Sequence, residues 1–406
     1  PLRPFLFLGF VLALTGAGCF SSGTQQSPGS PSMNDPALLL DDPNTVGWIE
    51  PWQGPFLGEK EADVWLVSHT KAPGSDRPLL RGTISERGSS RRGNLMSQTV
   101  QGNQFTFSFN WGPEEGEQGY GTTTHRQMNE EDLLQGEVTM GSSTRSFTLK
   151  RNQESPSFVL HRVATSTKEG DREPCSFELE YPVLQVSDTV SKGVADVINT
   201  KIVQYLHSSS TSLEREAEDF LGQCMTDLAD LRKDQAMSDW ARDISYVQTV
   251  EPEVVFGNGK IVSLLFLNYS YTGGAHGNYG YSAITFDLTT GEEVLLQDLV
   301  QTSQLKSFYQ QVSRALVNQG RDLLFQETTQ AIEGFLQDKT VSSEAQQREQ
   351  YGRLDNWYVT RQGIVFFYNP YEVAPYAAGV QEVTLPFSEW NASGRADTLK
   401  KFALIP

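Results

Sequence analysis

The sequence has few of the residues that build metal centres and disulfide-rich scaffolds. Its 406 residues include three cysteines and five histidines, and no two histidines form an HExxH or HxxxH pattern. This set excludes a multi-cysteine metal cluster and a scaffold held mainly by disulfides. We therefore predict no metal site and no cofactor.

Positive charge is also scarce. Lysine and arginine total 32 against 50 aspartate and glutamate residues, which gives a formal net charge of −18. A surface this acidic repels phosphate backbones, so we expect no nucleic-acid binding and favour cationic partners. Hydrophobic residues at 38% and aromatic residues at 11% suffice for buried cores, and the length predicts two or three domains.

Catalytic motifs are missing as well. The sequence contains no G-x-S-x-G elbow, no convincing Ser/His/Asp set and no paired-carboxylate motif. We therefore predict no catalytic residues and favour a binding protein over an enzyme. A hydrolase whose site cannot be recognised in the sequence is kept as a further alternative.

No segment is long and apolar enough to cross a membrane. The most apolar run covers residues 5–14 after Arg3, and small residues then lead to Cys19. Such a run is typical of a signal peptide, and small residues ending in cysteine resemble the bacterial lipobox. Gly16 stands where leucine is usual, so an ordinary cleaved signal peptide is the alternative interpretation.

These features predict an exported lipoprotein of the cell envelope. We expect a signal peptide at residues 1–18, lipidation of Cys19 and a flexible tether, rich in serine, glycine and proline, at residues 19–40. Phe20 and Ser21 offer no acidic retention signal. In a cell with two membranes, the anchor is therefore expected in the outer membrane.

Residues 41–165 show the signals of a small β-rich domain. Four aromatic side chains alternate with polar ones and so share one face of a strand. They are Phe105, Phe107, Phe109 and Trp111. We predict a small antiparallel sheet or barrel with this stripe on its buried face, and a sugar-binding platform is the alternative. A nearby basic cluster is interpreted as a solvated loop. It comprises Arg87, Arg91 and Arg92.

From about residue 170, strands mix with helices. We divide this part into an α+β subdomain at 170–258, a second domain at 259–392 and a C-terminal tail at 393–406. Apolar periodicity predicts helices at 194–205, 213–231 and 305–316, and strands at 175–182, 261–271, 283–288, 293–296, 357–360, 364–368 and 382–385. The predicted fold class is α+β: a C-terminal antiparallel sheet with helices packed on one face, preceded by a small all-β sheet or barrel domain.

Two loops carry a resemblance to a known family. The first is Tyr-Thr-Gly-Gly-Ala-His-Gly-Asn at 271–278, and the second is Asn-Pro-Tyr-Glu-Val-Ala-Pro-Tyr-Ala-Ala-Gly at 369–379. In this order they resemble the extracytoplasmic domain shared by RsiV-type anti-sigma factors and PdaC-type peptidoglycan deacetylases. The Glu-Tyr-Pro strand at 180–182 and the Val-Ile-Asn helix at 197–199 are similar to the small domain that precedes it there. The resemblance covers about residues 174–390.

The resemblance implies a sensing or wall-binding module. RsiV-type proteins bind lysozyme through this region, whereas PdaC-type enzymes hold their deacetylase in a separate domain with an Asp/His metal site. This sequence shows no sigma-binding segment, transmembrane helix or deacetylase domain, so signalling and deacetylation do not carry over. The favoured ligand is a cationic muramidase such as lysozyme. Peptidoglycan or another glycan, bound through the aromatic stripe, is the alternative.

The two loops supply the predicted ligand-binding residues. These are Tyr271, Gly273, Gly274, His276, Asn278, Tyr371, Glu372 and Tyr376. Glycines permit positive φ or close backbone approach, and tyrosines are enriched in binding hot spots. A histidine in such a loop either donates to a partner, acts as a general base or caps its own loop, and the capping role is favoured. The alternative is that the tyrosines and Glu372 are buried and only shape the fold. We expect the loops to share one surface because each leaves a strand of the same sheet.

Cys175 and Cys224 are predicted to form a disulfide. Export places them in an oxidising compartment, and lipid is expected to occupy the third cysteine, Cys19. Cys175 begins a strand and Cys224 lies on the apolar face of a helix, so the bond would join helix to sheet. Two separate buried thiols are the alternative.

Overall fold

The computed structural model describes most of the chain from residue 44 onward. The described ranges are 44–56, 60–70, 78–87, 92–101, 104–111, 118–128, 131–207, 212–233, 244–337, 356–390 and 395–405. The expected signal peptide, Cys19, the tether and Arg91 lie outside them. Within these ranges, the helices are all too short or too polar to span a membrane.

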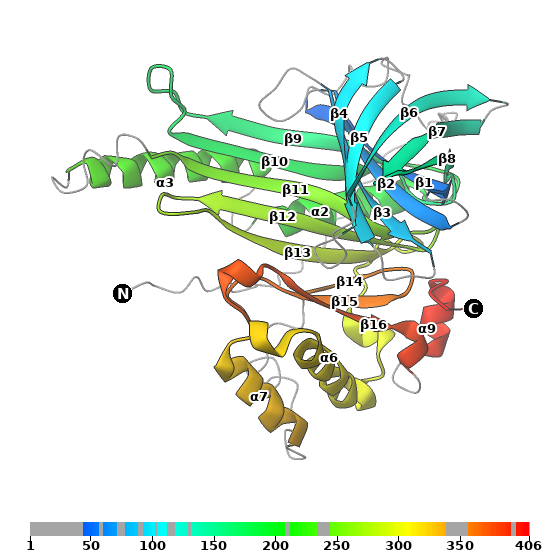
Figure 1. Cartoon of the computed structure of the whole chain (residues 1–406). Helices are drawn as coiled ribbons and strands as arrows, with labels where there is room; N and C mark the ends of the chain where they lie inside the picture. The colour runs from blue at the N-terminus through cyan, green and yellow to red at the C-terminus, as the bar shows by residue number, and fades with distance from the viewer. Residues whose placement is uncertain are drawn as a thin grey trace, which may run out of the picture.

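Strands β1 to β8 form a closed antiparallel barrel (Figure 1). Each strand pairs with the next, and β1 closes the ring by pairing with β8. The strands are β1 (Thr45–Pro55), β2 (Glu61–His69), β3 (Leu79–Glu86), β4 (Arg92–Gln101), β5 (Gln104–Trp111), β6 (Gln118–Met128), β7 (Glu131–Met140) and β8 (Ser143–Arg151). The predicted small barrel is thus confirmed.

Aromatic side chains fill the barrel. Phe105, Phe107 and Phe109 are buried in its core, with at most 8% of each side chain exposed. Gly121 on β6 leaves room for them, because a Cβ there would lie 2.4 Å from the ring of Phe107. Rings in this position cannot stack on a sugar, so the sugar-platform alternative is wrong for these three phenylalanines.

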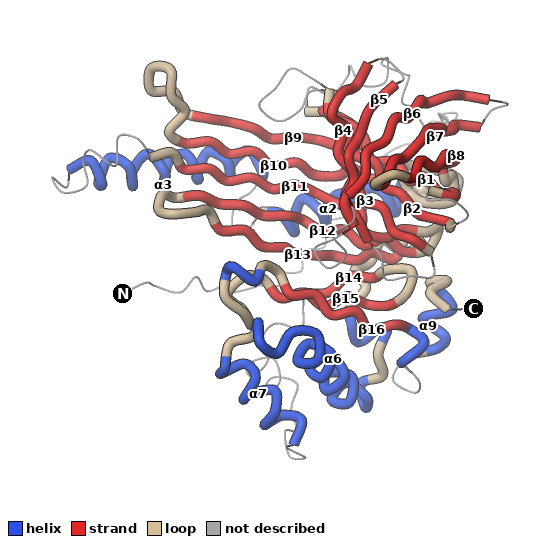
Figure 2. The backbone as a smooth tube through the Cα atoms, in the orientation of Figure 1, coloured by secondary structure: helices blue, strands red, loops and turns tan. Residues whose placement is uncertain are grey.

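The barrel continues into a second sheet through β1. The first part of β1, up to Ile49, pairs with β9, and the order then runs β9–β10–β11–β12–β13 (Figure 2). These strands are β9 (Phe158–Ser166), β10 (Cys175–Leu184), β11 (Tyr246–Gly257), β12 (Ile261–Tyr271) and β13 (Asn278–Asp287). Strand β9 therefore connects the barrel to the α+β part of the chain.

Strands β10 and β11 run parallel, whereas we predicted an antiparallel sheet. A parallel pair needs a crossover, which α2 (Lys192–Leu206) and α3 (Leu213–Lys233) supply. Their apolar side chains, among them Ile198, cover one face of the β9–β13 sheet. The predicted disulfide between Cys175 on β10 and Cys224 on α3 is present and ties the crossover to the sheet.

A smaller sheet packs on the other face of the β9–β13 sheet. It consists of β14 (Trp357–Val359), β15 (Gly363–Tyr368) and β16 (Gln381–Pro386). Val255 and Leu265 of the large sheet contact Val365 and Phe367 of the small one. Helices cover the outer face of the small sheet (Figure 1). They include α5 (Leu296–Leu299), α6 (Leu305–Gly320), α7 (Gln326–Gln337) and α9 (Ala396–Lys401).

The layers are therefore helix, sheet, sheet and helix, and the predicted single sheet with helices on one face is wrong. The reason lies in β15, whose six residues are all buried. A strand that is apolar on both faces must be covered from both sides. The predicted strand at 293–296 is also wrong: Glu293 makes one isolated bridge to Phe286, and the chain then enters α5.

Candidate ligand-binding surface at two loops

The loop between β12 and β13 is shaped by its glycines. Gly273 and Gly274 have φ values of 88° and 106°, which residues with a Cβ rarely adopt. The Tyr271 hydroxyl donates a hydrogen bond to the carbonyl of Gly274 at 3.1 Å. A Cβ on Gly277 would lie 2.5 Å from the ring of Tyr269, so glycine allows that ring to pack on the backbone. Each of these glycines thus has a local structural role.

The side chain of Asn369 attaches the loop between β15 and β16 to β13. Asn369 accepts from the backbone N–H of Tyr281 at 2.7 Å and donates to its carbonyl at 3.0 Å, as a neighbouring strand would. The Glu372 carboxylate accepts the backbone N–H of Asn369 at 2.8 Å and closes the turn. Tyr371 has a φ of 71°, a left-handed conformation that costs free energy for a non-glycine residue. Residues held in this way cluster at functional sites.

The two loops meet at a pair of stacked rings. The ring centroids of His276 and Tyr376 are 4.1 Å apart, and the ring planes differ by 20°. The Tyr376 hydroxyl donates to the carbonyl of Gly277 at 2.8 Å, and Nδ1 of His276 lies 3.0 Å from the same oxygen. The rings of Tyr279 and Tyr371 each lie 5.7 Å from that of Tyr376. The structure therefore brings both loops into one aromatic cluster.

The cause of this proximity differs from the predicted one. The first loop connects strands of the large sheet, and the second connects strands of the small sheet. The two sheets pack face to face, with β12 and β13 against β14 and β15. The loops therefore meet across the interface between two sheets and do not leave a common sheet.

The predicted residues differ in exposure. Exposed residues are Gly274, His276, Asn278, Tyr371 and Glu372, and half-buried residues are Tyr271, Gly273 and Tyr376. Tyr371 presents the most open tyrosine ring of the cluster, at 56% exposure. The alternative of fully buried tyrosines and a buried Glu372 is therefore wrong. His276, Tyr376 and Glu372 nevertheless also hold the loops in shape through the bonds described above.

Tyr269 and Tyr279 belong to the same surface and were not predicted. They lie directly opposite each other in the β12–β13 register, and cross-strand partners share a face of the sheet. Tyr269 is 36% exposed. The two-residue spacing of Tyr269 and Tyr271 was the available signal in the sequence, but it became informative only with the strand register.

The surface is nearly uncharged. Residues 269–281 contain no Asp, Glu, Lys or Arg, and residues 369–381 contain only Glu372. Loss of hydration, and then neighbouring tyrosines led by Tyr279, raise the pKa of Tyr376, so its hydroxyl stays protonated and keeps donating. Across the described residues, no group of three His, Cys, Asp or Glu side chains is arranged to hold a metal ion. The surface thus offers rings and hydroxyls to a ligand.

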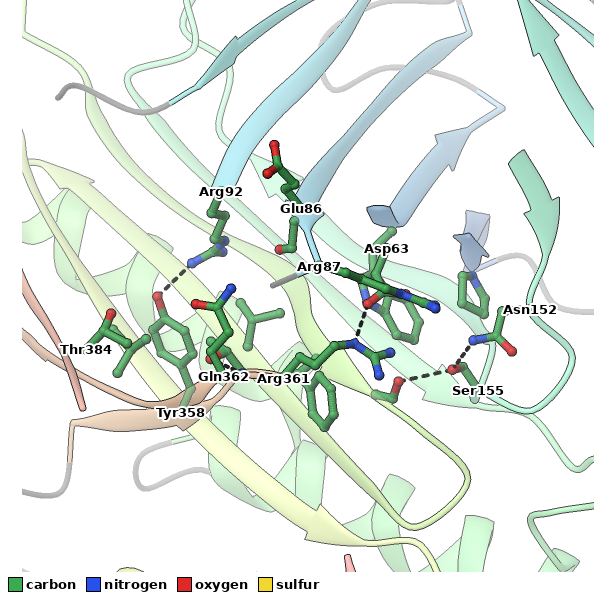
Figure 3. Close-up of a pocket in the computed structure, with 18 of the residues that line it drawn as sticks. Asp63, Glu86, Arg87, Arg92, Asn152, Ser155, Tyr358, Arg361, Gln362 and Thr384 are labelled. Carbon is green, nitrogen blue, oxygen red and sulfur yellow. Dashed lines mark hydrogen bonds and ion pairs between the residues drawn. The ribbon is translucent and has the colours of Figure 1, made fainter. Parts of the chain in front are cut away.

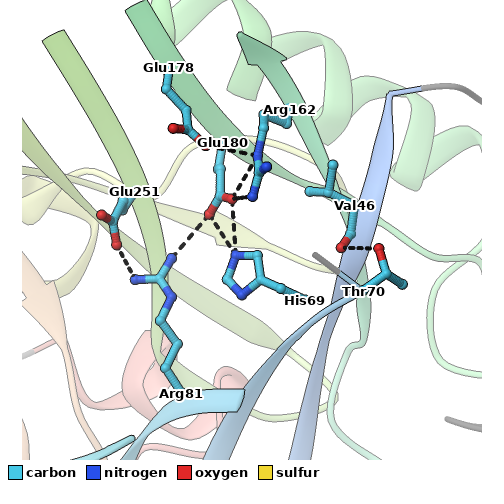
Figure 4. A network of polar contacts seen from close by, with 8 residues as sticks. All are labelled: Val46, His69, Thr70, Arg81, Arg162, Glu178, Glu180 and Glu251. Carbon is cyan, nitrogen blue, oxygen red and sulfur yellow. Dashed lines mark hydrogen bonds and ion pairs between the residues drawn. The ribbon is translucent and has the colours of Figure 1, made fainter. Parts of the chain in front are cut away.

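A buried charged network lies where the barrel meets the β9–β13 sheet (Figure 4). Glu180 on β10 contacts His69 on β2 at 3.0 Å and Arg162 on β9 at 2.7 Å. Its other oxygen lies 3.2 Å from Arg81 on β3, which also binds Glu251 on β11. Burial raises the pKa of Glu180, but the His69 hydrogen bond and the charges around it outweigh burial and lower the pKa overall. An ionised carboxylate thus joins the barrel to the sheet.

A cavity of about 90 Å³ lies where the barrel meets both sheets (Figure 3). Arg87 and Arg92 line it, and Arg92 lies on strand β4, so its interpretation as part of a solvated loop is wrong. Arg87 binds Asp63 of the barrel, whereas Arg92 binds Glu253 and Tyr358 across the junction. Sequence reasoning missed these contacts because the two partners of Arg92 are 161 and 266 residues away.

Family models match two parts of the chain. Residues 168–279 match a family described as Deacetylase PdaC, and residues 297–388 match a family described as Protein of unknown function (DUF3298). The first loop lies in the former match and the second loop in the latter. These matches support the resemblance to the shared extracytoplasmic domain. A search of curated proteins gave no match.

Solved structures of two proteins are also similar to the chain. A member of the DUF3298 family from Bacteroides fragilis is 17% identical, with a TM-score of 0.45, over 60% of this chain and 95% of that one. A DUF3298 family protein from Pseudomonas aeruginosa is 16% identical, with a TM-score of 0.39, over 61% of this chain and 98% of that one.

Proposed function

We propose that this chain is a non-catalytic binding module of the cell envelope, and that its loop surface binds a cationic muramidase such as lysozyme. The observation that carries the proposal is the preformed aromatic cluster. The ring centroids of His276 and Tyr376 are 4.1 Å apart, and the backbone of Tyr371 adopts a left-handed conformation. The match to a family described as Deacetylase PdaC supports a setting close to peptidoglycan.

The fixed position of the rings suits a protein ligand. The Tyr376 hydroxyl is anchored on Gly277, and the Tyr371 backbone N–H donates to the carbonyl of Ala374 at 3.0 Å. Because these contacts exist before binding, little conformational freedom is lost when a partner covers the rings. Rigid, partly exposed tyrosines of this kind are typical of binding hot spots.

Charge acts at longer range. The net charge of −18 attracts a cationic protein and speeds association. The loops themselves carry only Glu372, so contact with the rings stabilises the bound complex more than ion pairs do. We therefore expect salt to slow association and loss of a ring to speed dissociation.

Binding of a cationic lysozyme to the purified chain tests the proposal. The main variant is Tyr371→Ala, and the matched control is Tyr120→Ala, because Tyr120 is 58% exposed on the barrel strand β6. We expect Tyr371→Ala to weaken affinity about 30-fold, or ~2 kcal/mol, mainly through faster dissociation. Tyr120→Ala should leave the affinity unchanged. Equal affinities for both variants, with unchanged melting temperatures, would contradict the proposal.

A glycan strand of peptidoglycan is the second candidate, and the low charge of the loops favours it. Tyrosine rings stack on the apolar faces of sugars without help from ion pairs. Ionic strength distinguishes the candidates, because screening weakens attraction between an acidic chain and a cationic enzyme but not stacking on a neutral sugar. Binding of peptidoglycan fragments that is insensitive to salt and lost in Tyr371→Ala would favour the glycan.

The proposed location is testable separately. We propose that the chain is exported and held in the envelope, in the outer membrane of a cell with two membranes, by lipid on Cys19. Mass spectrometry of the mature protein should show a lipid-modified Cys19 at its N-terminus. Cleavage elsewhere, with Cys19 unmodified or removed, would refute the anchor without affecting the ligand-binding proposal.

A further inference from the structure

The cavity at the junction of the barrel with the two sheets is separate from the loop surface (Figure 3). Its volume is about 90 Å³. One water molecule needs about 10–15 Å³ of cavity volume, so the cavity has room for roughly six to nine water molecules. Its walls combine the rings of Trp65 and Phe256 with polar side chains. A small, largely polar molecule fits this space.

One end of the cavity carries two guanidinium groups. Asp63 on β2 lies between two guanidinium groups: Nη2 of Arg87 binds one oxygen at 2.6 Å, and Nε of Arg361 binds the other at 2.7 Å. These two positive charges lie beside one carboxylate of the wall, and Glu61, which does not line the cavity, also acts electrostatically on Arg87. Among the residues that the structure describes, Arg361 donates hydrogen bonds only to Asp63, through Nε. Its two Nη groups are therefore open to a ligand. Its side chain is 44% exposed.

The other end has a net negative charge. Arg92 on β4 binds Glu253 and, at 2.7 Å, the Tyr358 hydroxyl. That hydroxyl donates to the carboxylate of Glu382 at 3.0 Å. One guanidinium against two carboxylates leaves an excess negative charge, on the side where Glu382 lines the cavity. Burial raises the pKa of Tyr358, so its hydroxyl stays protonated and continues to donate.

The third carboxylate of the cavity wall adds no net charge, because Glu86 pairs with Lys60 at 2.5 Å. The cavity is therefore more positive at the Arg361 end than at the Glu382 end. In Figure 3, Arg92 and Tyr358 lie on one side of the cavity, and Asp63 lies with the other two arginines on the opposite side. A molecule with both charges balances both ends, whereas a simple ion balances only one.

We propose that this cavity binds a small zwitterion, a free amino acid or a dipeptide, with its carboxylate on Arg361 and its ammonium group beside Glu382. The two free Nη groups of Arg361 match the two oxygens of a carboxylate in a forked arrangement. The central carbon of this guanidinium lies 5.9 Å from the centroid of the Phe256 ring, and this contact keeps the guanidinium oriented. The apolar side chain of the ligand would pack on the rings of the wall.

Calorimetric titration with L-alanine, D-alanine and dialanine tests the proposal, with acetate and methylammonium as probes that carry one charge each. We expect at least one zwitterion to bind, and each single-charge probe to bind at least tenfold more weakly. Arg361→Gln and Glu382→Gln should each weaken zwitterion binding at least tenfold. Glu382→Gln keeps an oxygen for the Tyr358 hydroxyl, so this variant tests charge and not folding.

Two control variants make the test specific. Arg321→Gln removes an arginine that is 58% exposed and pairs with Glu333 outside the cavity, and Tyr371→Ala alters the loop surface. Neither should change zwitterion binding. The proposal is overturned if none of the three zwitterions binds, if acetate binds as tightly as alanine, or if Arg361→Gln retains full affinity. Failure of lysozyme binding at the loops would leave this result unaffected.

Discussion

Replacing Glu180 with alanine should destabilise the chain by about 3 kcal/mol. Its side chain is 1% exposed and contacts His69, Arg81 and Arg162. Removing one partner of a buried ion pair typically costs 3–5 kcal/mol, because the remaining charge is left buried without compensation. We expect the lower end of this range. Arg162 keeps Glu178 and Arg81 keeps Glu251, whereas His69 loses this carboxylate.

Urea denaturation measures the change, with Glu178→Ala as the control. Glu178 lies on the same strand and binds Arg162 at 3.0 Å, but its side chain is 25% exposed. Burial raises the pKa of Glu178, which means that the folded state does not favour its charged form. The free energy of unfolding of Glu178→Ala should therefore fall by less than about 1 kcal/mol. Equal losses for the two variants would refute the view that Glu180 joins the barrel to the sheet.

The pH dependence gives a second measure of the same contact. The pKa of Glu180 is lowered in the folded chain below its ordinary value of 4.5. The folded state therefore binds this proton less readily than the unfolded state, and the stabilisation is fully present above pH 4.5. It disappears as the pH falls through the folded pKa. The difference between the unmodified chain and Glu180→Ala should accordingly shrink in acid.

Three further predictions concern other parts of the fold. Burial raises the pKa of Glu50 in the barrel to about 7 from 4.5, so the folded state retains a proton that the unfolded state releases. Stability should therefore fall by up to ~3 kcal/mol as the pH rises from 4.5 to 7, and Glu50→Gln should remove this dependence in pH-stepped urea melts. The disulfide between Cys175 and Cys224 spans a sequence separation of 49, so replacing both with serine should cost ~4 kcal/mol in chemical denaturation. A change under 1 kcal/mol would contradict the chain-entropy argument. Gly277→Ala should displace the ring of Tyr269, which lies 2.5 Å from the added Cβ, and weaken ligand binding at the loops. The stability of the barrel should change less. Unchanged binding would show that this ring does not support the site.

The sequence by itself determined most of the local structure. The helical periods in 194–205, 213–231 and 305–316 correspond to α2, α3 and α6, because an amphipathic stripe needs only its own spacing. The alternation of Phe105, Phe107 and Phe109 was sufficient to predict a strand with a buried face. The two loops were also recognisable, because their residues in this order resemble those of a known family, and Gly273 and Gly274 do adopt the positive φ that glycine permits.

The tertiary structure decided how these pieces pair. Barrel closure, the parallel β10–β11 pair and the stacking of two sheets depend on which strand edges meet, and periodicity within one strand holds no information about its neighbour. The charged contacts show the same limit. Asp63 and Arg361 are 298 residues apart, so neither residue signals the other in the sequence. The stacked rings of His276 and Tyr376 likewise join loops of different sheets. Their geometry follows from the packing of those sheets, which forms only when the whole apolar core is buried.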